Sequence, residues 1–248
     1  HAAALQQLDD PRQLGRFPGA VDAFQRDEFA SLHVFPGFQV RLWSVTMCDY
    51  SISVDFNMHL DATGLLDTAE FIASPNYDER PPGTDINLLV IHNISLPPDE
   101  FDGNGVIELF TNRIDPHAHP YYQSLQDLKV SAHFFVRRDG TVIQFVPCLK
   151  RAWHAGISCW QGKERCNDFS IGIELEGSDS TAFTPAQYIT LIALTQCLCE
   201  HYPIQHITGH SDIAPGRKTD PGPYFDWEKY GDSLESDLIM QSTSNTPT

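Results

Sequence analysis

The sequence predicts an α/β protein in which helices flank a mixed central β-sheet, and three segments carry this prediction. Residues 87–93 form an unbroken apolar run that ends in polar residues, as a buried central strand does. Residues 130–147 are two β-rich runs joined by Asp139-Gly140, which is a strong hairpin signal. Residues 184–202 repeat apolar side chains at helical spacing, so this helix is expected to cover the sheet.

The remaining elements are predicted in chain order. A helix is expected around 105–112 and a strand over 169–177, which is apolar except for Glu174 and Glu176. In the helix over 184–202, Thr184 is the predicted N-cap, Pro185 suits the first turn, and Gln187 completes a capping box. A short strand over 206–210 and a short helix over 226–234 complete the predicted fold.

Residues 1–57 differ from the rest of the chain. Residues 38–57 have a β-like composition, but no turn pattern connects them to the next segment. Met58 is a natural start for the main domain. We therefore expect an N-terminal extension of unknown role over 1–57 and the functional domain over 58–248.

Composition excludes several classes of function. The 248 residues are 41% hydrophobic, and 16 basic residues against 33 acidic ones leave a formal net charge of −17. Such a charge repels phosphate backbones and anionic lipids, which argues against nucleic-acid and membrane-surface roles. No apolar run reaches the roughly 18 residues of a membrane span, and the first residues lack the basic and apolar regions of a secretory signal. The six cysteines form no CxxC pair, so we expect reduced thiols in a cytoplasmic protein.

Polar residues at the ends of apolar strands are candidates for a metal site. His92 ends the strand over 87–93, His210 ends the strand over 206–210, and Asp220 lies in the next loop. If the sheet brings the three together, they supply three ligands to one Zn²⁺ and leave a fourth position for water, as in catalytic zinc sites. A histidine at a strand end also serves as a hydrogen-bonded structural residue, and the sequence leaves that alternative open.

Two further residues have side chains suited to catalysis. Glu174 lies in an apolar strand, where desolvation would raise its pKa and make it a general base at neutral pH. Lys218 lies two residues before Asp220 and would stabilise a developing oxyanion beside a metal. The alternatives are an exposed carboxylate and a solvated ammonium. Cysteine catalysis by His154 with Cys159 or Cys166 is a rival chemistry, but no feature marks either thiol as activated.

Several long motifs together resemble one family. They are, in chain order, "LLVIHNISLPP", "VSAHFFVRRDGTVIQFVP", "KRAWHAG", "RCNDFSIGIELEG", "FTPAQY" and "TGHSDIAPGRKTDPGP". In order and wording they resemble the AmpD-type 1,6-anhydro-N-acetylmuramoyl-L-alanine amidases, over about residues 65–230. The resemblance implies the fold shared by these amidases, T7-type amidases and peptidoglycan recognition proteins, with one zinc ion in a groove at the sheet edge.

The resemblance also implies roles for individual residues. The zinc ligands of the family fall on His92, His210 and Asp220, its catalytic glutamate on Glu174, and its lysine on Lys218. Candidate substrate-binding residues in the matching motifs are Asn93, His133, Trp153, His154, Arg165 and Asn167. Arg165 is the candidate for gripping a stem-peptide carboxylate, since guanidinium binds carboxylate through two hydrogen bonds.

The implied reaction is zinc-dependent hydrolysis of the amide between the lactyl group of N-acetylmuramic acid and L-alanine. The loop over 96–116 resembles the one that distinguishes AmpD-type enzymes, which favours small 1,6-anhydro-muropeptides as substrates. The expected setting is peptidoglycan recycling in the bacterial cytoplasm, with an influence on β-lactamase induction, by a monomer. The alternatives are a non-catalytic muropeptide-binding protein and a lytic amidase acting on intact peptidoglycan.

Overall fold

The computed structural model describes residues 58–234 and the short strands at 31–32, 40–41 and 239–240. The chain divides into two units, His1–Asn57 and Met58–Thr248. In the first unit, β1 (Ser31–Leu32) pairs antiparallel with β2 (Val40–Arg41). The rest of residues 1–57 lies outside the described residues, so an N-terminal extension over this range stays a prediction. The candidate site residues all lie in the second unit.

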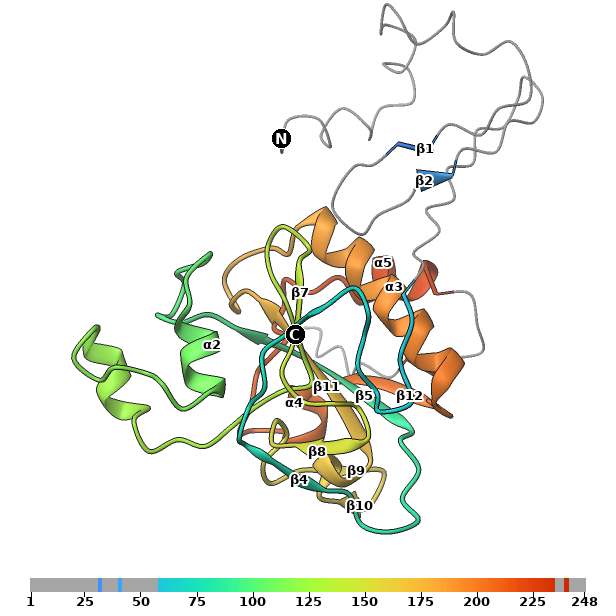
Figure 1. The fold of residues 1–248 in the computed structure, drawn as a ribbon, viewed down its shortest axis with the longest axis horizontal. Helices are drawn as coiled ribbons and strands as arrows, with labels where there is room; N and C mark the ends of the chain where they lie inside the picture. Colours follow the sequence, from blue (N-terminus) through green and yellow to red (C-terminus); the bar gives the residue numbers. More distant parts are fainter. Residues whose placement is uncertain (1–30, 33–39, 42–57, 235–238, 241–248) are drawn as a thin grey trace, which may run out of the picture. The chain divides into compact units, whose positions relative to one another are not determined.

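The second unit is built on a seven-stranded mixed sheet, with strand order β13-β12-β5-β11-β6-β7-β3 (Figure 1). The pairs are parallel except for β6 and β7, which form the predicted antiparallel hairpin. Its strands are β3 (Glu70–Phe71), β5 (Leu88–Ile94), β6 (Phe134–Val136), β7 (Val142–Gln144), β11 (Ser170–Glu176), β12 (His206–Gly209) and β13 (Ile239–Met240). The mixed sheet with flanking helices confirms the predicted fold class.

The central pair of strands, β5 and β11, determines where the polar residues lie. All seven residues of β11 are buried, as are the first five of β5, which is why both segments read as near-continuous apolar runs. Their parallel register places Glu174 directly beside His92. On the other side of β11, Glu174 is paired with Phe135 of β6. Paired residues share a face of the sheet, so the carboxylate stands between an imidazole and a phenyl ring.

The two strands of the hairpin are shorter than the sequence suggests. The turn is where Asp139-Gly140 predicts it, and Gly140 adopts φ +88°, a conformation that glycine accepts without strain. The backbone before β6 is used elsewhere: the N–H of Ser131 donates to the carbonyl of Trp153, and that of His133 to the carbonyl of Gly172. These bonds attach the segment before the hairpin to neighbouring parts of the chain.

Helix α3 (Pro185–His201) covers one face of the sheet, and α5 (Trp227–Asp232) lies beside it (Figure 1). The N-terminus of α3 has the predicted capping box. Thr184 Oγ1 accepts from the N–H of Gln187, and the Gln187 side chain accepts from the N–H of Thr184. The buried Gln187 amide also donates to the carbonyls of Val136 and Glu176, which fastens the helix to β6 and β11.

The opposite face of the sheet carries His92 and Glu174 and is covered by smaller elements. Leu88 and Val90 pack there against Ala155, Cys166, Phe169 and Ile213. The elements on this side are α4 (His210–Ile213), η3 (Cys166–Asp168), the pair β4 (Tyr77–Glu79) and β8 (Lys150–Ala152), and the pair β9 (Cys159–Trp160) and β10 (Lys163–Glu164). They form the surroundings of the site.

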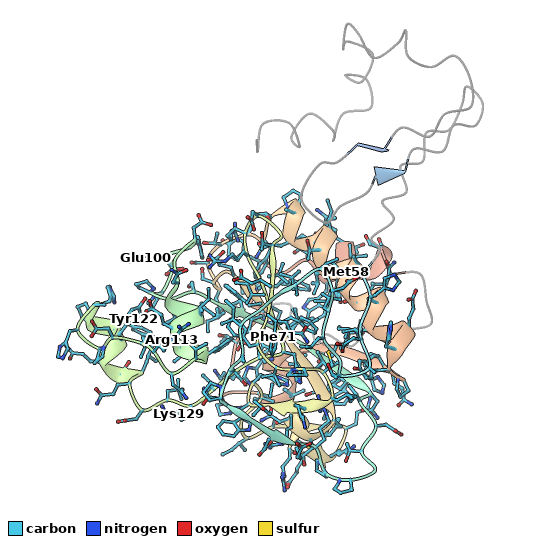
Figure 2. The ribbon with its side chains drawn as sticks, viewed as in Figure 1. Met58, Phe71, Glu100, Arg113, Tyr122 and Lys129 are labelled. Carbon is cyan, nitrogen blue, oxygen red and sulfur yellow. The ribbon has the colours of Figure 1, made fainter. Side chains whose placement is uncertain are left out.

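A second apolar cluster lies over the hairpin. It joins α2 (Gly105–Phe110) and the 3-10 helix η2 (Pro120–Ser124) to Phe135, Ile143 and Phe145. Tyr122, labelled in Figure 2 on this part of the chain, is buried in the cluster. The predicted helix around 105–112 is thereby confirmed, and so are the helices at 184–202 and 226–234, each to within two residues at either end.

Two further predictions concern chain chemistry. Within residues 58–234, no helix has both the length and the apolar character needed to cross a bilayer. The five cysteines in that range are free thiols, of which Cys148, Cys166 and Cys197 are buried. Cys48 lies outside the described residues.

We predict that Thr184→Ala lowers the free energy of unfolding by about 1–2 kcal/mol, because it removes an N-cap. The same hydroxyl also donates to the carbonyl of Arg138, at 2.7 Å. Urea unfolding followed by circular dichroism measures the change. Thr141→Ala, at an exposed position in the hairpin turn, is the control and should stay within about 0.5 kcal/mol of the parent. Equal losses in the two variants would contradict the capping role.

Candidate metal centre and active site

Three side chains converge on one point. His92 Nδ1 lies 3.0 Å from His210 Nδ1 and 2.9 Å from Asp220 Oδ2, and the distance from His210 Nδ1 to Asp220 Oδ2 is 3.0 Å. Both imidazoles are buried, and the carboxylate is largely so. Within residues 58–234, these residues form the group suited to holding a metal ion.

The fold brings the three together through a short loop. His92 comes from the end of β5, and His210 is the first residue of α4, immediately after β12, which pairs with β5. Asp220 is brought back by a backbone hydrogen bond, since the N–H of Ser211 donates to the carbonyl of Asp220 at 2.9 Å. Gly209 permits this approach, because a Cβ there would lie 2.8 Å from Pro221 Cδ.

The donor set fits a divalent cation. His210 Nε2 lies 3.0 Å from the carbonyl oxygen of Ala155, which can only accept, so this nitrogen carries the proton and Nδ1 presents a lone pair to the centre. Three ligands at zinc distances around a tetrahedron would be separated by roughly 3.3 Å, close to the observed triangle. An imidazole lone pair and a carboxylate oxygen held this close repel each other unless a positive charge lies among them.

Burial and the contacts within the group determine its protonation. Desolvation, helped by the neighbouring His210, lowers the pKa of His92 to about 4, which keeps the ring neutral at physiological pH. Burial acts to raise the pKa of Asp220, but the contacts with His210 and His92 outweigh it and lower that pKa, so the carboxylate is ionised. Neutral imidazoles and an ionised carboxylate are the forms that bind metal.

Glu174 lies next to this centre. Burial raises its pKa well above the usual value, the charge of Asp220 raises it further, and the charge of Lys218 opposes the shift. Its Oε2 is buried and has no hydrogen-bond partner in the protein. A desolvated carboxylate with a free oxygen facing the site is able to exchange a proton near neutral pH.

Lys218 is exposed on the same loop as Asp220. Its positive charge lowers the pKa values of both Glu174 and His92, and the side chain is in contact with water. An exposed cation at this position can meet a group that arrives from solvent.

The structure places the other predicted site residues at different depths. Asn93 is half-buried, and its amide donates to Asp179 Oδ1 at 2.8 Å and to the carbonyl of Pro221 at 3.0 Å. This amide therefore attaches the Asp220 loop to the loop after β11. Trp153 is half-buried with an unpartnered Nε1, and Arg165 is exposed and paired with Asp168. A substrate contact by these residues stays a prediction.

His133, His154 and Asn167 are buried beneath the site. His133 Nδ1 accepts from the N–H of Gly172 at 3.0 Å, and its Nε2 lies 3.1 Å from the carbonyl oxygen of Lys150. Burial lowers the pKa values of His133 and His154 well below the usual range. Their present contacts are with protein groups, and substrate binding by any of the three stays a prediction.

His154 makes contacts that bear on the cysteine alternative. Its Nδ1 lies 2.9 Å from His92 Nε2, and its Nε2 lies 3.1 Å from Ser170 Oγ. Both ring nitrogens are therefore engaged, which leaves neither to activate Cys159 or Cys166. Burial also raises the pKa of the Cys166 thiol, which disfavours a thiolate.

Some residues that shape the site gave no signal in the sequence. Arg80 is largely buried and donates to the carbonyls of Cys148, Asn167, Asp168 and Ser170. Asp179, in the loop after β11, accepts a hydrogen bond from the amide of Asn93 in β5, which is 86 residues away in sequence. Neither lies in a motif with a known chemical role, and a single arginine or aspartate in a polar stretch normally indicates a solvated surface.

Comparisons with known proteins agree with this geometry. The family model of the N-acetylmuramoyl-L-alanine amidases, Amidase_2, matches residues 82–223. The 1,6-anhydro-N-acetylmuramyl-L-alanine amidase AmpD of Citrobacter freundii is 57% identical over 169 residues, which cover 67% of this chain and 90% of the relative. AmpD of Haemophilus influenzae is 50% identical over 175 residues, covering 69% and 95%.

Solved structures give the same result. The crystal structure of a selenomethionine AmpD derivative matches with a TM-score of 0.70 at 56% identity, covering 71% of this chain and 99% of that one. The solution structure of Citrobacter freundii AmpD matches with a TM-score of 0.55 at 53% identity, covering 73% and 100%. On the fold, the residues at its centre and these matches, the chain belongs to the N-acetylmuramoyl-L-alanine amidase family and is an amidase of the AmpD type.

Proposed function

We propose that the chain is a zinc-dependent amidase that cleaves the bond between the lactyl group of 1,6-anhydro-N-acetylmuramic acid and L-alanine in small muropeptides. The observation that carries the proposal is the convergence of His92, His210 and Asp220 directly beside the unpartnered Glu174 carboxylate. The AmpD relatives, at 50–57% identity, are 1,6-anhydro-N-acetylmuramyl-L-alanine amidases, which supports this substrate class.

The chain's own residues account for the steps around the amide. His92, His210 and Asp220 would hold Zn²⁺, which when bound supplies Lewis-acid polarisation and lowers the pKa of water toward about 7. Glu174 takes a proton from the attacking water and passes it to the departing L-alanine nitrogen, a task that its raised pKa suits. Lys218 places a positive charge where the carbonyl oxygen becomes anionic.

We place this reaction in peptidoglycan recycling in the bacterial cytoplasm, where removal of anhydro-muropeptides would also influence β-lactamase induction. The free state of the five described cysteines supports a reducing compartment. We propose the half-buried Trp153 and the exposed Arg165 as substrate contacts. We propose a monomer as the active form.

The first prediction of this proposal tests the activity itself. Incubation with an anhydro-muramoyl tripeptide should release free peptide, seen by mass spectrometry, and a chelator should abolish the release until Zn²⁺ is restored. Binding without cleavage in the presence of stoichiometric zinc would make the chain a recognition protein instead. Equal turnover of intact sacculi and anhydro-muropeptides would indicate a lytic enzyme.

The second prediction separates catalysis from stability on one strand. Glu174→Gln should lower kcat by about 10²–10⁴-fold, because the amide cannot transfer the proton. It should keep bound zinc and should not lower the melting temperature, since it removes an unpartnered buried acid.

Glu176→Gln is the matched control, two residues along the same face. Its carboxylate accepts from the N–H groups of Asp102 and Arg138, so this change should lower the melting temperature and keep kcat within about fivefold. Loss of zinc from Glu174→Gln would instead show that Glu174 supports the metal site.

The third prediction concerns the exposed ammonium. Lys218→Met should lower kcat by about 10²–10³-fold with little change in KM, because the charge acts on the transition state rather than on the bound ground state. Steady-state kinetics on the anhydro-muramoyl tripeptide measure kcat and KM separately. Lys229→Met removes a cation of α5 that lies over the ring of Tyr188 in α3, and it should leave both constants unchanged. A rise in KM alone would mean that Lys218 only binds substrate.

A further inference from the structure

One two-residue segment contacts both histidines of the metal centre. His154 Nδ1 lies 2.9 Å from His92 Nε2, and the carbonyl oxygen of Ala155 lies 3.0 Å from His210 Nε2. In each ligand, the nitrogen that faces away from the centre is the one in contact. Partners of this kind fix the orientation and tautomer of a metal-binding imidazole.

The direction of the hydrogen bond to His92 is set by a backbone carbonyl further away. Ser170 Oγ donates its only proton to the carbonyl of Cys166 at 2.6 Å. It must therefore accept from His154 Nε2, at 3.1 Å. A neutral imidazole carries one N–H, so His154 Nδ1 is a lone pair and accepts from His92 Nε2. This leaves His92 Nδ1 as the lone pair that faces the metal centre.

The His154 ring has room for one position. It lies against β11 at Gly172, where a Cβ would come within 2.4 Å of the ring. His154 is 8% exposed, and its ring meets the His92 ring edge-on with centroids 5.0 Å apart. The absence of a side chain at residue 172 is thus a condition for the contact with His92.

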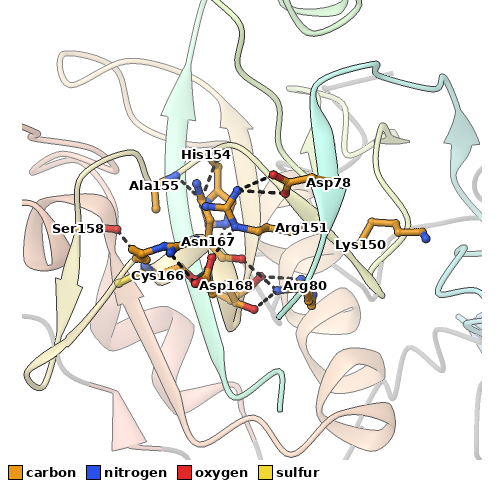
Figure 3. Close-up of polar contacts among 12 residues, drawn as sticks. Asp78, Arg80, Lys150, Arg151, His154, Ala155, Ser158, Cys166, Asn167 and Asp168 are labelled. Atoms are coloured by element: carbon orange, nitrogen blue, oxygen red, sulfur yellow. Dashed lines mark hydrogen bonds and ion pairs between the residues drawn. The ribbon is translucent and has the colours of Figure 1, made fainter. Parts of the chain in front are cut away.

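The backbone of the segment is held by one amide. Asn167 Oδ1 accepts from the N–H of His154 at 3.1 Å and from that of Ala155 at 2.8 Å (Figure 3). Arg80 in turn donates to the carbonyl of Asn167, which fixes the short helix η3 that carries this residue. Arg217 adds a second donor to the carbonyl of Ala155, at 2.8 Å.

We propose that His154 and Asn167 are positioning residues of the metal site: His154 fixes the tautomer of His92, and Asn167 holds both His154 and the Ala155 carbonyl that orients His210. This inference rests on the proposed zinc-dependent function. The sequence predicts both residues as substrate contacts. The present proposal instead gives them a role beneath the metal centre.

The test measures zinc affinity of the metal-free protein by competition with a chromophoric chelator, independently of turnover. His154→Leu removes the acceptor and should weaken Zn²⁺ binding by about 10–100-fold. His154→Asn keeps an acceptor oxygen near the Nδ1 position and should recover most of that loss. Wild-type affinity in His154→Leu, with lost activity, would overturn the proposal and return His154 to the substrate.

Asn167 is tested with its own pair of variants. Asn167→Leu, which has a similar shape, should weaken Zn²⁺ binding by about tenfold or more, while Asn167→Asp keeps the oxygen that accepts both N–H groups and should bind nearly normally. Gln187→Leu is the control, since it also removes a buried amide, one that holds α3 rather than the segment. It should lower the melting temperature but leave zinc affinity within about threefold.

Two results separate this inference from the proposed function. If the unaltered protein binds no zinc or cleaves no muropeptide, the proposed zinc-dependent function is wrong, and this result is obtained without the variants. If the unaltered protein does both while the leucine variants bind zinc normally, the positioning role alone fails. A loss of affinity in Gln187→Leu as large as in Asn167→Leu would also overturn the proposal, because the effect would then report stability.

Discussion

The parallel register between β5 and β11 is the constraint on which the site depends. It sets Glu174 beside His92 and Gly172 beside Val90 on the same face, so the base, the first histidine and the space for His154 are fixed together. A shift of one residue would turn the carboxylate to the opposite face of the sheet. Because both strands are buried on both faces, such a shift would cost much free energy. The packing of the core therefore fixes the geometry of the site.

The site combines groups that a core normally excludes. Glu174 Oε2 is buried beside His92 without a hydrogen-bond partner, and three lone-pair donors lie in a triangle about 3 Å on a side. Both features oppose folding, because buried polar atoms without partners lose the hydrogen bonds that water would give them. The apolar contacts of the sheet and of α3, which packs on the opposite face, offset this unfavourable free energy. Stability and chemistry are thus separated between the two faces of one sheet.

The layer beneath the metal centre is polar but well bonded. From Arg80 through Asn167 and from Ser170 through His154, most donors meet acceptors at fixed positions. A network of this kind has few alternative arrangements, because breaking one bond leaves a buried group unpaired. The histidine ligands are consequently held in place by the protein itself, which limits the reorganisation that metal or substrate binding must drive.

The sequence by itself determined the fold class, the capping box of α3, the hairpin turn at Gly140 and the family, because each depends on local pattern or on motifs in a fixed order. It also singled out His92, His210, Asp220, Glu174 and Lys218 as candidates. It could not determine that Asn167 and His154 lie beneath the metal centre, or that Arg80 and Asp179 take part at all. Those contacts join segments up to 90 residues apart. Only the tertiary structure decides which nitrogen of a buried histidine faces the metal centre and which one contacts a protein group.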